Sequence, residues 1–159
     1  MIETKTIRRR TIFQSAEMPS LRLVREGGSA RTKLHGPVEV RDFLVQFFRH
    51  EATESLVVLL FDAQYKVIGN APVIVSRGIV NASLCHPREV FRPAILAGAV
   101  QIVIAHNHPS GEISPSTEDR NVTKQIFEAG KLLDIPLRDH IIIGDGEYFS
   151  FAEAGIMPM

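Results

Sequence analysis

The chain has 159 residues, of which 45% are hydrophobic and 23% charged, so it can form one globular domain with a buried core. Its formal net charge is zero, so no overall field favours nucleic acid or an acidic substrate. A single cysteine, Cys85, excludes an internal disulfide framework, and no apolar run reaches membrane-span length, so we expect a cytoplasmic protein without membrane contact.

Residues 1–36 form the first predicted segment, a basic N-terminal arm. Residues 1–33 carry eight lysines and arginines against three glutamates, and residues 21–24 alternate enough to form an edge strand. Residues 26–33 contain two adjacent glycines and predict a flexible loop. A short basic arm is usually solvated, and weak contact with nucleic acid is its functional alternative.

A helix is predicted from Pro37, and core packing explains its apolar face better than partner binding does. The residues that form this face are Val40, Phe43, Leu44, Phe47 and Phe48. Residues 55–61 are almost continuously apolar and predict a strand buried on both faces. A turn over 62–66 should lead to a second strand from Val67 through 73–75, ended by Gly78. Gly69 and Pro72 within it predict a bulge or an edge position.

The next helix is expected to begin near Pro87. The side chains expected to face its core are Val90, Phe91, Ile95 and Leu96. Pro93 lies about two turns in, where it should kink the helix or mark its true beginning. No second thiol accompanies Cys85, so we expect the adjacent His86 to be a helix cap or a neighbour of a ligand, not a ligand.

A longer helix is predicted from about residue 116 to residue 134, before Pro136. The residues of its expected buried stripe are Val122, Ile126, Ala129, Leu132 and Leu133. Residues 137–143 then predict a strand, residues 145–146 a hairpin turn, and residues 148–151 a last strand. No role can be assigned to the short tail, residues 156–159.

The most informative sequence is His-Asn-His-Pro-Ser-Gly, residues 106–111, which follows an apolar run at 100–105. The run predicts a buried strand. Residues two apart in a strand point to the same side, so the rings of His106 and His108 can approach one point. The Pro-Ser-Gly that follows predicts a turn.

Asp119 is the third candidate ligand, because Pro115 and Ser116 predict the start of a helix that has Asp119 in its first turn. Two imidazoles and a carboxylate could bind one Zn²⁺ and leave the fourth position to water, as in catalytic zinc sites. Each residue alone has a structural explanation; for example, Ser116 and Asp119 have the spacing of a capping box. Their combination on a strand-turn-helix frame favours the metal site.

These motifs resemble a known family. The order His-x-His, seven residues, Ser, two residues and Asp is similar to the JAMM signature of the MPN+ metalloproteases. The string at 106–111, with those at 86–90 and 139–144, resembles the RadC branch of that superfamily. The resemblance covers residues 37–155 and implies a single α/β domain of the MPN/JAB, cytidine-deaminase-like type, with a mixed, curved sheet flanked by helices. It also suggests a short form without the N-terminal helix-hairpin-helix region of longer relatives.

The resemblance implies roles for further residues. In the JAMM pattern a glutamate precedes an apolar strand upstream of the histidines, which indicates Glu54 as the catalytic acid–base, with Glu51 as the alternative. Ser116 would donate a hydrogen bond to the oxyanion that develops on the scissile carbonyl. His140 could support the metal site by contacting a ligand, although plain packing beside a strand explains it equally well.

Two functions remain open from the sequence. The first is a zinc-dependent metallohydrolase, a peptidase or isopeptidase acting on a peptide or protein substrate. The second is a metal-containing binding or scaffold module associated with DNA repair or mobile-element DNA, as the RadC resemblance suggests. A zinc deaminase is excluded, because its Pro-Cys-x-x-Cys motif needs two cysteines. Neither the substrate nor the oligomeric state can be predicted.

Overall fold

The computed structural model describes residues 32–49, 51–78 and 85–159. The predicted edge strand at 21–24 and most of the basic arm lie outside the described residues, as does the segment at 79–84. In chain order the elements are α1 (Pro37–Phe48), β1 (Ser55–Phe61), β2 (Val73–Arg77), α2 (Pro87–Ala97), β3 (Gln101–Asn107), α3 (Thr117–Leu133), β4 (Leu137–Ile143) and β5 (Tyr148–Ser150).

The strands form one five-stranded sheet in the order β2-β1-β3-β4-β5. Only the β3–β4 pair is parallel, and α3 connects these two strands as a crossover helix. The pairs β1–β2, β1–β3 and β4–β5 are antiparallel. The predicted α/β fold with a mixed sheet is therefore confirmed.

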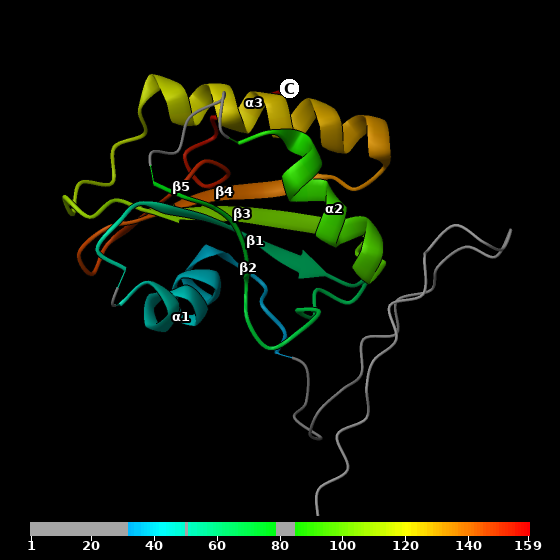
Figure 1. Cartoon of the computed structure of the whole chain (residues 1–159), viewed down its shortest axis with the longest axis horizontal. Coiled ribbons are helices and arrows are strands. Elements are labelled where there is room, and N and C mark those ends of the chain that lie inside the picture. Colours follow the sequence, from blue (N-terminus) through cyan, green and yellow to red (C-terminus); the bar gives the residue numbers. More distant parts are fainter. Residues whose placement is uncertain (1–31, 50, 79–84) are drawn as a thin grey trace, which may run out of the picture.

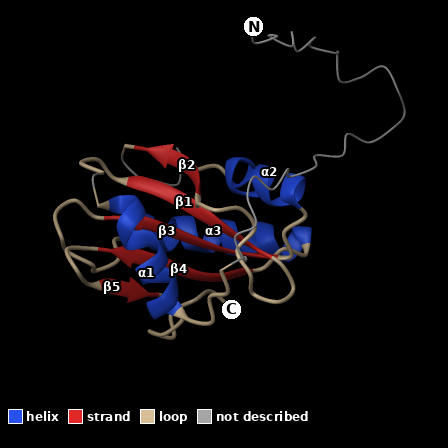
Figure 2. Cartoon of the chain, turned by 90° about the horizontal axis from the view of Figure 1, so that it is seen from below, coloured by secondary structure: helices blue, strands red, loops and turns tan. Residues whose placement is uncertain are grey.

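Helices cover both faces of the sheet (Figure 1). One face packs against α2 and α3, and the other against α1, which lies in front of the strands in Figure 2. Every residue of β1 and of β3 is buried, as the continuous apolar runs predict. The hydrophobic core thus has two layers that share the interior strands β1, β3 and β4.

The return from β1 to β2 differs from its prediction. Val67 forms only an isolated bridge with Phe61, and regular pairing does not resume until Val73. The sequence between them contains Gly69, which has a φ of 96°, and Pro72, which cannot donate to a strand ladder. β2 is consequently short and lies at the edge of the sheet, as these two residues indicate.

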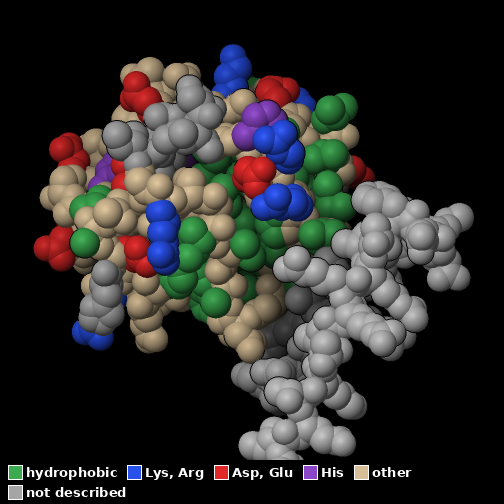
Figure 3. All heavy atoms as spheres, viewed as in Figure 1, with side chains coloured by type: hydrophobic (Ala, Val, Ile, Leu, Met, Phe, Trp, Pro, Cys, Tyr) green, Lys and Arg blue, Asp and Glu red, His purple; other side chains and the backbone are tan. Residues whose placement is uncertain are grey.

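Near the C-terminal ends of α2 and α3, the side chains predicted to be buried are exposed. Leu96 and Leu132 lie on the far side of their helices from the buried stripe and are 48% and 88% exposed. Ile95 and Leu133 are 56% and 42% exposed. In α3 the buried face ends at Gly130, where the returning backbone of Ile135 passes beneath the helix. Hydrophobic side chains consequently remain on the surface beside the charged ones of α2 (Figure 3).

The start of α2 resolves the question that Pro93 raised. The helix begins at Pro87 and continues through Pro93, so Pro93 does not mark its beginning. His86 is the N-cap, and its Nδ1 accepts a hydrogen bond from the backbone N–H of Arg88 at 3.1 Å. The predicted cap is confirmed.

Among the described residues, no helix is both long and apolar enough to cross a membrane.

Candidate metal centre

Four side chains from three elements meet where β1 begins, β3 ends and α3 begins, towards the left of Figure 1. Glu54 directly precedes β1, His106 lies in β3, His108 directly follows β3, and Asp119 lies in the first turn of α3. One ligand atom from each lies within 4.8 Å of all the others. The structure therefore brings together all three predicted ligands and the predicted acid–base.

The nitrogen His106 Nε2 is at the centre of this cluster. It lies 2.9 Å from His108 Nε2, 3.1 Å from Asp119 Oδ1 and 3.9 Å from Glu54 Oε1. His106 and Asp119 are 0% and 1% exposed, whereas Glu54 and His108 are partly exposed. The cluster is thus closed on the side of the core and accessible on the side of Glu54 and His108.

The outer ring nitrogens of the two histidines are bonded away from the cluster. His108 Nδ1 lies 2.6 Å from the backbone carbonyl of Glu112, which can only accept, so Nδ1 carries a hydrogen, and Nε2 is the bare nitrogen of the neutral ring. His106 Nδ1 lies 2.8 Å from His140 Nε2, and His140 Nδ1 lies 2.6 Å from Thr123 Oγ1. His140, which was predicted to support the site, therefore contacts the candidate ligand His106 directly.

Asp119 takes part in both arrangements that the sequence left open. Ser116 caps α3, and its backbone N–H and hydroxyl both donate to Asp119 Oδ2, at 2.8 and 2.7 Å. The second oxygen, Oδ1, is directed at His106. Burial acts to raise the pKa of Asp119, but the hydrogen bond and charge of a protonated His106, together with the bonds from Ser116, lower that pKa well below its usual range. The carboxylate is consequently ionised at neutral pH, as a metal ligand must be.

The structure separates the two candidate glutamates. The carboxylate of Glu51 forms an ion pair with Arg77 at 3.2 Å and lies outside the cluster. Glu54 contributes its carboxylate to the cluster. Among these two residues only Glu54 is therefore placed to exchange a proton with a molecule bound there.

Asn107, between the two histidines, was not singled out from the sequence. Its Oδ1 accepts from the backbone N–H of Ser55 at 2.8 Å, and its Nδ2 donates to the carbonyls of Thr53 and Glu51 at 3.1 and 3.4 Å. The segment on either side of Glu54 is thereby tied to the end of β3. Neither Asn107 nor Thr123 was identified from the sequence, because the partners of Asn107, and the His140 that Thr123 contacts, are remote in the chain.

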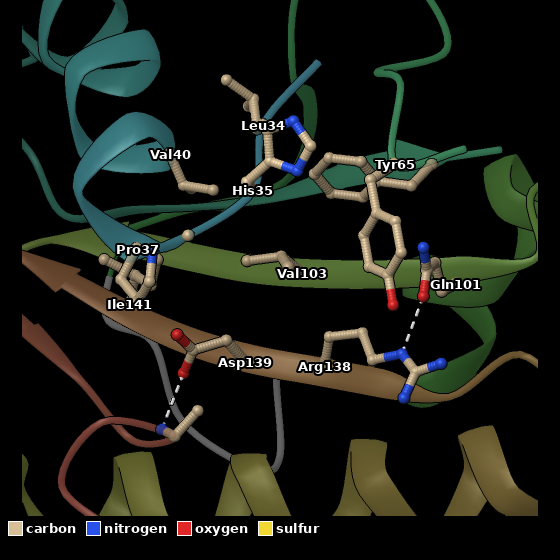
Figure 4. A pocket seen from close by; sticks show the side chains of 13 residues that line it. Leu34, His35, Pro37, Val40, Tyr65, Gln101, Val103, Arg138, Asp139 and Ile141 are labelled. Atoms are coloured by element: carbon tan, nitrogen blue, oxygen red, sulfur yellow. Dashed lines mark hydrogen bonds between the residues drawn. The ribbon is translucent and has the colours of Figure 1, made fainter. Parts of the chain in front are cut away.

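A cleft of about 450 Å³ adjoins His108. Its walls include the end of α1, the turn at 109–111 and the loop at 144–146. A second cavity, of about 160 Å³, lies between α1 and the sheet and includes none of the four cluster residues (Figure 4). Of the four cluster residues, His108 is thus the one that lines the larger cleft.

The donor set fits a divalent metal ion. Two bare imidazole nitrogens 2.9 Å apart, with a carboxylate oxygen 3.1 Å from one of them, repel each other unless a cation or a proton lies between them. Ligand atoms around a tetrahedral zinc ion lie roughly 3.3 Å apart, given bonds of about 2.1 Å. The separations in the cluster are close to this value, so the cluster could hold one metal ion.

A five-stranded α/β domain with this histidine and carboxylate cluster at the end of β3 defines a protein of the JAB/MPN class. The model of the RadC-like JAB domain matches residues 34–156, and the chain belongs to this family. The family resemblance drawn from the motifs is confirmed.

Curated relatives support the same family. A UPF0758 protein of Trichlorobacter lovleyi is 45% identical over 121 residues, which are 76% of this chain and 52% of the relative. A UPF0758 protein of Alkaliphilus oremlandii is 46% identical, with 76% and 51% coverage, and one of Rubrobacter xylanophilus is 45% identical, with 80% and 55%. The chain thus spans about half the length of these relatives.

Proposed function

We propose that the chain is a zinc-dependent metallohydrolase that cleaves a peptide or isopeptide bond. The observation that supports this proposal best is the convergence of His106 Nε2, His108 Nε2 and Asp119 Oδ1 beside the carboxylate of Glu54. Family membership supports a metallohydrolase in general. The names of the relatives assign no substrate, so the scissile bond is inferred from the JAMM-like order of the residues.

His106, His108 and Asp119 would hold the zinc ion, because two nitrogens and one carboxylate oxygen suit this metal. When bound in such a site, zinc polarises a carbonyl and lowers the pKa of a coordinated water to about 7. The protein itself supplies the order of the site. Ser116 restrains the carboxylate of Asp119 through Oδ2, and Glu112 orients the ring of His108 through its carbonyl.

Glu54 is the proposed acid–base, which would accept a proton from the attacking water and return it to the leaving amine. Its carboxylate is 25% exposed, so it can contact both solvent and a bound substrate. Ser116 is the proposed oxyanion donor. Since its hydroxyl donates to Asp119 Oδ2, this role requires that Ser116 exchange that bond when substrate binds.

Cleavage of a mixed peptide pool that includes isopeptide-linked peptides tests the proposal. We expect the zinc-loaded protein to generate new carboxyl termini, which both peptide and isopeptide cleavage produce and mass spectrometry detects, and an Asp119→Ala variant of equal folded content to generate none. A zinc-loaded wild-type protein that leaves every peptide intact would contradict a peptidase. That result would favour the metal-containing binding module instead.

A further inference from the structure

A buried chain of hydrogen bonds joins two parts of the candidate metal centre behind the cluster. His106 Nδ1 contacts His140 Nε2 at 2.8 Å, and His140 Nδ1 contacts Thr123 Oγ1 at 2.6 Å. The Thr123 hydroxyl lies 2.6 Å from the backbone carbonyl of Asp119. All four residues are at most 1% exposed. The chain therefore begins at one proposed ligand and ends at the backbone of another.

The donors and acceptors in this chain have one consistent order. A carbonyl can only accept, so the single hydroxyl hydrogen of Thr123 is directed to Asp119. Thr123 Oγ1 then accepts from His140 Nδ1–H. His140 is fully buried, which favours its neutral ring, so its Nε2 is bare and accepts from His106 Nδ1–H. In the neutral ring of His106 the remaining nitrogen, Nε2, is then bare, and it faces the cluster.

We propose that Thr123 and His140 are positioning residues that fix His106 in the tautomer whose bare Nε2 faces the metal centre. This proposal rests on the proposed zinc site but not on any particular hydrolysed bond. A histidine ligand commonly donates its outer N–H to a carboxylate, a backbone carbonyl or water, and here a second histidine accepts it. The tautomer is thereby set by a hydroxyl two hydrogen bonds away from the ligand.

The ring of His140 is also held in place by contacts outside this series of hydrogen bonds. It stacks on Phe151, with centroids 4.8 Å apart and an interplanar angle of 15°, and its backbone N–H donates to Asp139 Oδ1 at 2.7 Å. These contacts fix the position and the plane of the ring before any metal binds. His140 is thus a rigid acceptor for His106, as an orienting group must be.

The first test determines the tautomers directly in the metal-free wild-type protein. Long-range ¹H–¹⁵N spectra of the histidine rings at pH 8, where an ordinary histidine is neutral, distinguish Nδ1–H from Nε2–H. We expect His106 and His140 to be protonated at Nδ1 and bare at Nε2. A spectrum in which His106 carries its hydrogen on Nε2 would overturn the proposal, and this test needs no variant to fold.

The second test measures the affinity for Zn²⁺ by competition with a chelator of known affinity. Thr123→Val and His140→Phe remove the hydroxyl and the acceptor nitrogen but keep similar shapes, and each should weaken zinc binding about 10- to 100-fold. Thr123→Ser keeps the hydroxyl, and His140→Gln offers an oxygen near the position of Nε2, so both should retain an affinity within about threefold of wild type. Wild-type affinity in Thr123→Val would contradict the proposal.

The two proposals fail separately. Failure of every peptide to be cleaved, with zinc affinity and tautomers as expected, would reject the peptidase and leave the roles of Thr123 and His140 intact. Zinc binding that is unaffected by removal of the hydroxyl, in a protein that still cleaves peptides, would reject those roles alone. Backbone ¹H–¹⁵N spectra of each variant exclude misfolding as the cause of a loss.

Discussion

At the scale of single residues, the candidate centre depends on which carboxylate faces the histidines. Glu54 contributes an oxygen 3.9 Å from His106 Nε2, while Glu51 is paired with Arg77 at 3.2 Å. The two glutamates are three residues apart and have the same chemistry. Only their positions distinguish them, so they form a matched pair for substitution.

Glu54→Gln should lower the rate of peptide hydrolysis by about 10²- to 10⁴-fold, because the amide cannot exchange the proton. Zinc content should remain that of wild type, since the proposed ligands are unchanged. Glu51→Gln, the control, should keep its activity. Initial rates and metal content of both variants measure this, and full activity in Glu54→Gln would reject Glu54 as the acid–base.

Asn107→Ala should destabilise the fold by about 1–3 kcal/mol, because the backbone N–H of Ser55 and the carbonyl of Thr53 lose their buried partner. It should also reduce hydrolysis, since the segment that carries Glu54 is released from β3. Urea unfolding and steady-state kinetics measure the two effects. An Asn107→Ala protein with wild-type stability would show that this tether is not needed.

Asp139 gives the fold a pH dependence of its own. Burial raises the pKa of this carboxyl, although Ser150, Ala152 and the backbone of His140 donate to it. A raised pKa in the folded state means that the folded protein binds the proton more tightly than the unfolded chain, so stability falls as pH rises through that pKa. Asp139 lines the cavity of Figure 4.

Substitution of Asp139 tests whether stability falls with rising pH for this reason. The difference in unfolding free energy between wild type and Asp139→Asn should decrease as pH rises from about 4 towards 7, because only wild type must ionise the buried group. Urea titrations of the metal-free proteins at several pH values measure the difference. A difference that is constant or increases over this range would contradict the raised pKa.

At the scale of elements, apolar runs bounded by turn residues predict the strands well. The strands expected at 55–61 and 137–143 have the same bounds in the structure, and the helix expected from Pro37 begins there. Burial is harder to predict near helix ends. Leu132 and Leu133 continue the apolar composition of α3, but the chain turns after Leu133, packs against Gly130 and leaves both leucines exposed.

Gly130→Ala should therefore destabilise the fold by about 1–3 kcal/mol, because the added methyl group has no room. In an isolated helix the same change would be stabilising, since alanine is more favourable there than glycine by about 1 kcal/mol. A Cβ at this position would lie 2.7 Å from the carbonyl oxygen of Ile135 and 3.3 Å from the ring of Phe91. The exposed control, Glu128→Ala, should change stability by less than about 0.5 kcal/mol. Thermal unfolding compares the two, and a stabilised Gly130→Ala would contradict the close packing.

The site was predictable only where its residues follow one another in a pattern. His106 and His108 are two apart on a strand, and Asp119 has a capping position, so spacing alone indicates all three. Glu54 was identified through the family resemblance, because an acid before a strand is usually just solvated. Asn107 bonds to groups far away in the sequence, and Thr123 contacts His140, 17 residues away, so neither contact leaves a local pattern.

At the scale of the whole molecule, the sheet places one centre at the junction of three elements. The parallel pair β3–β4 and its crossover helix bring Asp119 to His106, and the antiparallel pair β1–β3 brings Glu54 to the same place. The chain spans about half the length of its curated relatives, so the partners and substrates of a complete relative remain proposals for this domain.

The central requirement is that His106, His108 and Asp119 together hold one zinc ion. Elemental analysis of the purified protein after zinc supplementation and dialysis measures this directly, beside Asp119→Ala and Glu54→Gln. We expect one zinc per chain in wild type and in Glu54→Gln, and almost none in Asp119→Ala. A wild-type protein without zinc, or an Asp119→Ala protein with the full amount, would contradict the metal centre.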